Sequence, residues 1–208
     1  MNTPLDLRAA HRTAVLASAD VVSAITVDDL RRPTPCAGWT LADLLTHMTV
    51  QHRGFAAAAR GAGGDLTVWN PHTVADAVMA DPAGAYRAAV DDVLDAFAAD
   101  GVLEAMFALP EFGAEASFPG ATAIGFHFID YVAHGWDAAR SIGAPFALPD
   151  DVITAAVPIA LGVPDGDFRA AEGSPFARAL DEVDGERDID RILRHLGRSP
   201  DWAPTVVA

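Results

Sequence analysis

Apolar residues recur every three or four positions along most of the chain. In residues 40–60 this spacing places Leu44, Met48 and their apolar neighbours on one face of a helix. The same period predicts further helices over 4–25, 73–80, 83–100, 122–142, 149–161 and 188–197. Residues 102–120 depart from it, and there we expect two short extended pieces or a hairpin around Gly113. The pattern therefore predicts a mostly helical protein.

Boundary signals agree with these helices. Thr40 stands three residues before Asp43, which is the spacing of a capping box at a helix start. Gly143 is placed to end the most apolar of the predicted helices. Four or five substantial helices with short connections indicate an up-down four-helix bundle with extra short helices. We assign the bundle to residues 1–160 and expect the loop-rich residues 161–208 to pack on the same domain as a C-terminal extension.

Composition narrows the class of protein. The 208 residues are 51% hydrophobic and 21% charged, which is typical of a globular domain. The net charge of −15 should repel nucleic acid and anionic membranes, so we expect neither as a partner. A single cysteine, the lack of a basic-then-apolar leader and the lack of an apolar run of about 18 residues favour a cytoplasmic protein. No heptad repeat specifies an oligomer, and we expect a monomer or a homodimer.

One polar stripe interrupts the most apolar helix. Within residues 124–140, His127, Asp130, His134 and Asp137 follow one another at offsets of three, four and three. Their side chains therefore share one face of the helix. Imidazoles and carboxylates are costly to bury in apolar surroundings unless they have a partner. The partner here could be a cation, another polar group or water.

We favour a divalent metal as that partner. Asp130 and His134 lie one helical turn apart, and His47, near the apolar face of the helix 40–60, would supply a third ligand. Two imidazoles and a carboxylate suit zinc with an open position, and nickel or iron(II) accept the same donors. His47 could instead be a core histidine bonded to a carbonyl, and its spacing alone favours that interpretation.

The other two members of the stripe have several open roles. His127 could be a fourth ligand, a group that supports a ligand, or a substrate contact. Asp137 could accept a hydrogen bond from a ligand's second ring nitrogen, or it could pair with Arg140.

The remaining histidines and the cysteine have simpler interpretations. We expect His11 and His52 to be exposed, and His195, near a helix C-terminus, to be structural. His52 lies about 140° around the helix from His47, so the two do not share a face. We favour Cys36 as a small buried residue in a turn over Cys36 as a nucleophile. The chain has no Gly-x-Ser-x-Gly motif for a serine nucleophile.

Three segments of the chain resemble a known family. Residues 33–40, Pro-Thr-Pro-Cys-Ala-Gly-Trp-Thr, with Asp-Leu-Leu-x-His-Met at 43–48, resemble the first signature of the mycothiol-dependent maleylpyruvate isomerase N-terminal domain family. Residues 130–143, Asp-Tyr-Val-Ala-His-Gly-Trp-Asp-Ala-Ala-Arg-Ser-Ile-Gly, resemble the second signature. Residues 190–200 resemble the closing segment of an actinobacterial branch of that family. The three segments span nearly the whole chain.

The resemblance implies a fold, a ligand set and a chemistry. The family belongs to the DinB-like superfamily of metal-binding four-helix bundles, so His47, Asp130 and His134 would be metal ligands in a bundle of that kind. The metal would bind a low-molecular-weight thiol, mycothiol in this family. The metal-bound thiolate would then be the nucleophile of a transferase or an isomerase acting on an electrophilic small molecule.

Such an enzyme needs cations that hold the carboxylate of the thiol. Arg53 and Arg140, together with Arg60, are the candidates, although each could equally lie on a solvated face.

The chain departs from the family at two points. Asp130 stands where the characterised isomerases carry glutamate, and the residues after 160 are too few for their sterol-carrier-like second domain. Two other functions therefore stay open. One is a non-catalytic module that binds a metal or a small molecule, and the other is a hydrolase that uses metal-bound water.

Overall fold

The computed structural model describes residues 6–36, 38–171, 174 and 176–204. Its helices are α1 (Arg8–Val22), α2 (Leu41–Ala59), α3 (His72–Ala80), α4 (Pro82–Ala98), α5 (Gly120–Ile142), α6 (Asp150–Leu161) and α7 (Asp188–His195). Short 3-10 turns cover Val27–Asp29, Leu66–Trp69, Pro110–Phe112 and Asp167–Ala170. Each helix predicted from the apolar pattern is present, so the mostly helical fold is confirmed. Within the described residues, no helix is both long enough and apolar enough to cross a membrane.

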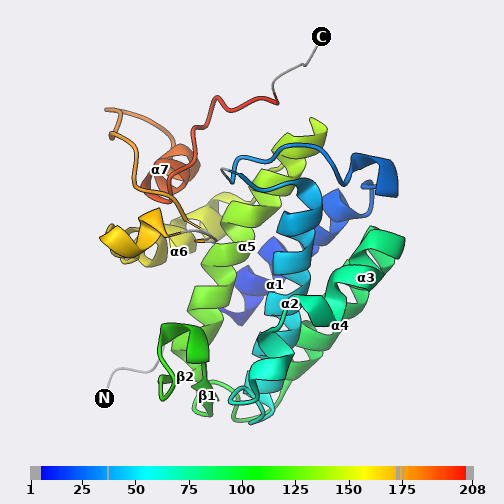
Figure 1. The fold of residues 1–208 in the computed structure, drawn as a ribbon. Helices are drawn as coiled ribbons and strands as arrows, with labels where there is room; N and C mark the ends of the chain where they lie inside the picture. Colours follow the sequence, from blue (N-terminus) through cyan, green and yellow to red (C-terminus); the bar gives the residue numbers. More distant parts are fainter. Residues whose placement is uncertain (1–5, 37, 172–173, 175, 205–208) are drawn as a thin grey trace.

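Four long helices form the bundle. α1, α2, α4 and α5 run side by side in Figure 1, with α3 against α2 and α4. Their apolar faces meet in a core that includes Val15, Leu45, Val90 and Tyr131. Burial of these faces holds the helices together, as in other helical bundles. The packing brings α2 and α5 into contact, and these two helices carry the predicted metal ligands.

The start of α2 is fixed by the predicted capping box. The backbone N–H of Asp43 donates to Thr40 Oγ1 over 3.3 Å, and the backbone N–H of Thr40 donates to the Asp43 carboxylate over 2.9 Å. The negative charge of Asp43 also lies at the positive end of the helix dipole. From this start, Leu44 and Leu45 fall in the core, and His47 falls at its edge.

A two-stranded hairpin fills the connection between α4 and α5. β1 (Met106–Ala108) pairs antiparallel with β2 (Ser117–Pro119). The 3-10 turn Pro110–Phe112 lies between them, followed by Gly113, whose φ of 129° suits only glycine. The predicted hairpin around Gly113 is confirmed. It lies at the end of the bundle where α5 begins (Figure 1).

Arginine side chains order the C-terminal extension and attach it to the bundle. Arg169 donates to the backbone carbonyls of Val163 and Pro164, each over 2.9 Å, which holds the loop that follows α6. Arg140 on α5 donates to the carbonyls of Pro200 and Trp202 over 3.2 and 2.6 Å. The extension is thus held through its backbone. The division of the chain at residue 160 stays a prediction.

Candidate metal centre

The three predicted ligands come together between α2 and α5. His47 Nε2 lies 3.6 Å from Asp130 Oδ2, and His134 Nε2 lies 3.3 Å from Asp130 Oδ1. The donor atoms of the three residues all lie within 4.8 Å of one another. The His134 side chain is fully buried, whereas those of His47 and Asp130 keep 18% and 15% of their exposure. Solvent therefore reaches two of the three.

Two ring nitrogens in this cluster have no hydrogen-bond partner. Nε2 of His47 and Nε2 of His134 are buried, and each faces the Asp130 carboxylate without the geometry of a hydrogen bond to it or to another described residue. A buried polar atom without a partner is unfavourable. A divalent cation between the two rings would give each nitrogen a partner and would take the Asp130 carboxylate as a third donor. The residues present therefore fit a metal ion such as zinc.

Charges in the cluster favour the donor forms of Asp130 and His47, whereas His134 holds a proton that a metal would displace. Burial alone would raise the pKa of Asp130, but His134 and His47 hold it well below its usual range. Burial lowers the pKa of His47, and Asp130 offsets only part of that shift. Burial alone would also lower the pKa of His134, but the charge of Asp130 raises it well above its usual range. At His134 a cation would therefore replace a proton, as metals do when they bind histidine.

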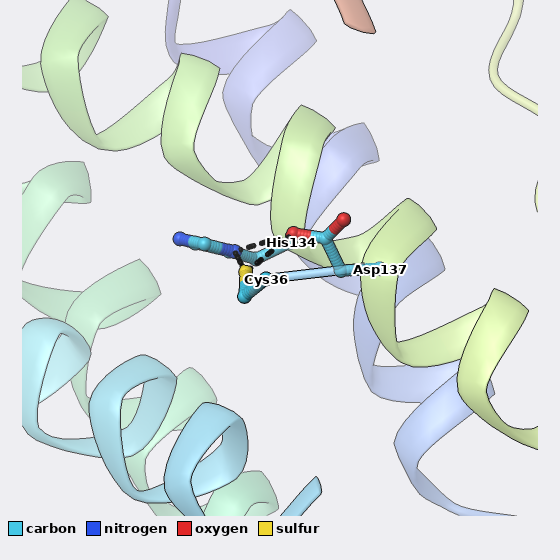
Figure 2. A group of neighbouring side chains, drawn as sticks. All are labelled: Cys36, His134 and Asp137. Carbon is cyan, nitrogen blue, oxygen red and sulfur yellow. Dashed lines mark hydrogen bonds and ion pairs between the residues drawn. The ribbon is translucent and has the colours of Figure 1, made fainter. Parts of the chain in front are cut away.

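Asp137 orients the His134 ring. Its Oδ2 accepts a hydrogen bond from His134 Nδ1 over 2.8 Å (Figure 2). With Nδ1 engaged in this way, Nε2 of the same ring is the nitrogen that faces Asp130. A carboxylate on the second ring nitrogen is the usual support of a metal-binding histidine. One of the two predicted roles of Asp137 is thus present. The other, a pair with Arg140, is wrong, because Asp137 pairs with Arg198 instead.

Arg198 from the C-terminal extension forms an ion pair with Asp137. Its Nη2 donates to Asp137 Oδ2 over 2.9 Å and to Cys36 Sγ over 3.0 Å. Cys36, buried as predicted, donates to the same carboxylate over 3.2 Å (Figure 2). Burial would raise the pKa of Asp137, but Arg198 lowers it to about 2. Cys36, His134 and Asp137 are also close enough to hold a cation. The guanidinium of Arg198 already supplies the positive charge at that position.

A pocket of about 930 Å³ opens beside the cluster. Its walls come from the connection before α2, from α2 and α3, and from the extension; they include Trp39, Cys36, His47, Arg169 and Arg198. His47 therefore belongs both to the metal cluster and to the pocket wall. The volume is in the range of sites that bind small molecules.

The predicted thiol-binding arginines lie away from this pocket. Arg53 is exposed on α2, and Arg60 is held in an ion pair with α4. Arg140 donates to the backbone of the extension. Of the arginines that the structure describes, Arg169 and Arg198 line the pocket. Thiol binding by Arg53 or Arg140 stays a prediction.

Three further histidines form a separate chain in the core. His11 Nε2 lies 2.8 Å from His127 Nδ1, and His127 Nε2 lies 3.1 Å from His52 Nδ1. The predictions that His11 and His52 are exposed are wrong, because only 1% and 0% of them is accessible. Their rings pack among aromatic side chains, and His52 stacks on Tyr131 with the ring centroids 4.0 Å apart. Both ring nitrogens of His127 contact these two histidines. Neither nitrogen is therefore left to serve as a fourth metal ligand.

Comparisons with known proteins identify a family and two relatives of this chain. A family model described as the mycothiol maleylpyruvate isomerase N-terminal domain matches residues 11–139. That span contains His47, Asp130 and His134. Two uncharacterized proteins of Mycobacterium tuberculosis, MT0763 and Rv0738, are each 30% identical over 198 residues, which cover 94% of this chain and 99% of theirs.

Two solved structures share the fold at lower sequence identity. The crystal structure of the mycothiol-dependent maleylpyruvate isomerase matches with a TM-score of 0.57 and 12% identity, over 82% of this chain and 75% of that chain. The crystal structure of a histidine-to-alanine mutant of the mycothiol-dependent maleylpyruvate isomerase matches with a TM-score of 0.59 and 12% identity, over 98% of this chain and 85% of that chain. At this identity the likeness concerns the fold alone, and it agrees with the predicted helical bundle.

Proposed function

The chain belongs to the mycothiol maleylpyruvate isomerase N-terminal domain family, and on that premise we propose that it is a metal-dependent enzyme that uses a low-molecular-weight thiol. It would act as a transferase or an isomerase on an electrophilic small molecule. The observation that carries the proposal is that two buried imidazole nitrogens, neither of them hydrogen-bonded among the described residues, converge on the Asp130 carboxylate. Mycothiol is the thiol named for the solved relatives, and it is the thiol we propose here.

His47, Asp130 and His134 would hold the metal, and zinc suits this donor set best. When bound, the metal would supply positive charge that favours the thiolate form of a thiol near neutral pH. Asp137 keeps a proton on Nδ1 of His134 and so leaves Nε2 as the ligand atom. Arg198 fixes Asp137 in turn, through two of its guanidinium nitrogens.

The pocket beside His47 supports this proposal by its size and its lining. Its volume of about 930 Å³ can hold a low-molecular-weight thiol and part of a second molecule. Trp39 and Met79 give the walls apolar area, whereas His72 and Ser174 offer hydrogen-bonding groups. A ligand with both polar and apolar parts would find partners on these walls. Because His47 belongs to the wall, a thiol bound here would lie next to the metal cluster.

A combined isomerisation and thiol-transfer assay tests the proposal. The protein is stripped of metal, reloaded with about one equivalent of zinc, and incubated with mycothiol and maleylpyruvate while NMR follows both compounds. An isomerase converts maleylpyruvate without consuming mycothiol. A transferase consumes thiol and electrophile in equal amounts, and a panel of epoxides and enones widens that search. Metal-free protein and His134→Ala are the matched controls, and we expect both to be inactive.

Two outcomes would contradict the proposal. Turnover of a substrate without any thiol would indicate a hydrolase that uses metal-bound water. Mycothiol binding without turnover of any electrophile would indicate a non-catalytic binding module of the same fold.

A further inference from the structure

Two donor sets share the imidazole of His134, one at each ring nitrogen. At Nε2 lie the carboxylate of Asp130, 3.3 Å away, and the ring of His47. At Nδ1 lie Asp137 Oδ2, 2.8 Å away, and Cys36 Sγ, 3.8 Å away (Figure 2). Within each set the donor atoms all lie within 4.8 Å of one another. The same ring could therefore hold a cation on either side.

The second donor set is the softer of the two, because it contains a thiol. Thiolate sulfur binds zinc and other soft cations more strongly than a carboxylate oxygen does. Cys36, His134 and Asp137 are also all buried, whereas the side chains of His47 and Asp130 are partly open to solvent. Donor chemistry alone would thus place a cation such as zinc beside Cys36 at least as readily as beside His47.

A charged nitrogen of Arg198 occupies the cation position of the second set. Its Nη2 lies 2.9 Å from Asp137 Oδ2, 3.0 Å from Cys36 Sγ and 3.5 Å from His134 Nδ1. Zinc would lie about 2.0–2.3 Å from the same three atoms. A metal ion there would overlap the guanidinium and would meet a charge of its own sign. The metal and the guanidinium therefore cannot share this position.

The C-terminal extension fixes Arg198 in this position. Nη1 of Arg198 donates to the carbonyl of Leu196 over 2.7 Å, and its guanidinium carbon lies 5.1 Å from the centre of the Phe176 ring. The residue is only 2% exposed, and an arginine side chain keeps its positive charge in proteins. The guanidinium therefore excludes a metal from the second set for as long as the extension is docked.

We propose that Arg198 determines which side of His134 binds the metal. Its guanidinium fills the cation position beside Cys36, which leaves the side with His47 and Asp130 as the metal site. The inference rests on the proposed function and deepens it. Cys36 is the one thiol of the chain, so its exclusion from the metal leaves the low-molecular-weight thiol as the sulfur ligand. Arg198 thus keeps the protein's own sulfur from competing with the substrate.

Cadmium titration tests this assignment without relying on turnover. Cadmium is softer than zinc and prefers thiolate, and a cadmium–thiolate bond absorbs in the ultraviolet. Because the chain has one cysteine, this absorption reports Cys36 alone. The metal-free, folded wild type should show none of it as cadmium is added. Arg198→Gln should gain the absorption of about one cadmium–thiolate bond per chain, calibrated with the wild type in denaturant, where Cys36 is accessible.

Arg140→Gln is the matched control. Arg140 also attaches the extension to α5, but it donates to the carbonyls of Pro200 and Trp202 instead of to Cys36. We expect this variant to show no cadmium–thiolate absorption, as in the wild type. Circular dichroism confirms that each variant is folded. If Arg198→Gln does not fold, Arg198→Leu takes its place, because leucine fills part of the same space without a charge.

Three outcomes would overturn the assignment. The first is cadmium–thiolate absorption in the folded wild type, and the second is its absence from the folded Arg198 variant. The third is equal absorption in Arg140→Gln, because docking of the extension rather than the guanidinium would then exclude the metal. A wild type that binds neither zinc nor mycothiol would contradict the proposed function, whatever cadmium does.

Discussion

The same two helices carry two histidine clusters that differ in what surrounds their nitrogens. α2 contributes His47 to one cluster and His52 to the other, and α5 contributes His134 and His127 in the same way. In the first cluster two nitrogens converge on the Asp130 carboxylate, and neither has a hydrogen-bond partner among the described residues. In the second cluster the rings are joined in a line, nitrogen to nitrogen. There only the terminal nitrogen, Nε2 of His52, is buried without a partner in the described structure.

The difference shows what distinguishes a candidate ligand from a core histidine. Burial lowers the pKa of His11 to about 3, and it lowers the pKa values of His52 and His127 well below their usual range. These rings are neutral, and hydrogen bonds join them to one another. In the metal cluster, a carboxylate one turn from His134 reverses the effect of burial on the pKa of that ring. Convergence on a carboxylate, rather than burial itself, therefore distinguishes the candidate metal site.

Among the substitutions, removal of His127, the central histidine of the three joined rings, should cause the largest loss of stability. His127→Ala leaves a cavity and takes a hydrogen-bond partner from both His11 and His52. We expect the free energy of unfolding to fall by about 3 kcal/mol or more. Denaturant unfolding measures this loss, and metal analysis of the folded variant should give the same zinc content as the wild type. Loss of zinc from the folded variant would mean that the two clusters are not separate.

Removal of Arg198 should lower the zinc affinity of the first cluster and leave the second cluster unchanged. Arg198→Gln leaves Asp137 buried without its cation, so Asp137 orients His134 less firmly. We expect zinc affinity to fall by roughly 10- to 100-fold, measured by competition with a chelator. Arg140→Gln is the control, because Arg140 also attaches the extension but does not contact Asp137. An equal loss in both variants would assign the effect to docking of the extension.

Mild acid should act mainly through the second cluster. Its three histidines have lowered pKa values in the folded protein, so the unfolded chain binds protons that the folded chain does not. Their contribution to stability is complete above pH 6.5 and is lost as the pH falls toward the folded value of about 3 for His11. The loss is about 1.4 kcal/mol per pH unit for each histidine.

Thermal unfolding between about pH 8 and pH 5 would reveal this loss. His11→Gln removes one of the three groups, so its stability should depend less steeply on pH. A wild type whose stability is flat across this range would contradict the view that these rings are buried and neutral.

Loss of the α2 cap should cause the smallest loss of stability, and it should affect the two histidine clusters equally. Thr40→Ala removes the side chain that accepts from the Asp43 backbone. We expect the free energy of unfolding to fall by about 1 kcal/mol. Since α2 carries one histidine of each cluster, zinc content should remain that of the wild type. A fall in zinc affinity without a fall in stability would mean that the cap sets the position of His47 directly.

Much of the fold was predictable because its signals are local. Helical spacing, the Thr40–Asp43 capping box and Gly143 fixed most helix boundaries to within a few residues. The same spacing placed Asp130 and His134 on one face of a helix. His47 lies on a different helix, so its place beside them came from the resemblance of its motif to the family rather than from periodicity.

The errors arose where tertiary packing decides burial. His52 points away from His47, and from the sequence that direction suggested solvent. α2 is buried around more than half of its circumference, so the direction leads into the core instead. His11 is buried because the polar side of α1 meets another imidazole on α5. Arg198 was missed because its partner Asp137 lies 61 residues away, and only the folded chain brings them together.

Zinc content tests the central claim most directly. Untagged wild type, His47→Ala and His52→Ala are incubated with zinc, dialysed and analysed by plasma mass spectrometry, with the folded fraction of each confirmed by circular dichroism. The two variants make the same change on the same helix, five residues apart. We predict about one zinc ion per chain in the wild type and in His52→Ala, and none in His47→Ala. No zinc in the wild type, or equal loss from both variants, would contradict the assignment of the metal site to His47, Asp130 and His134.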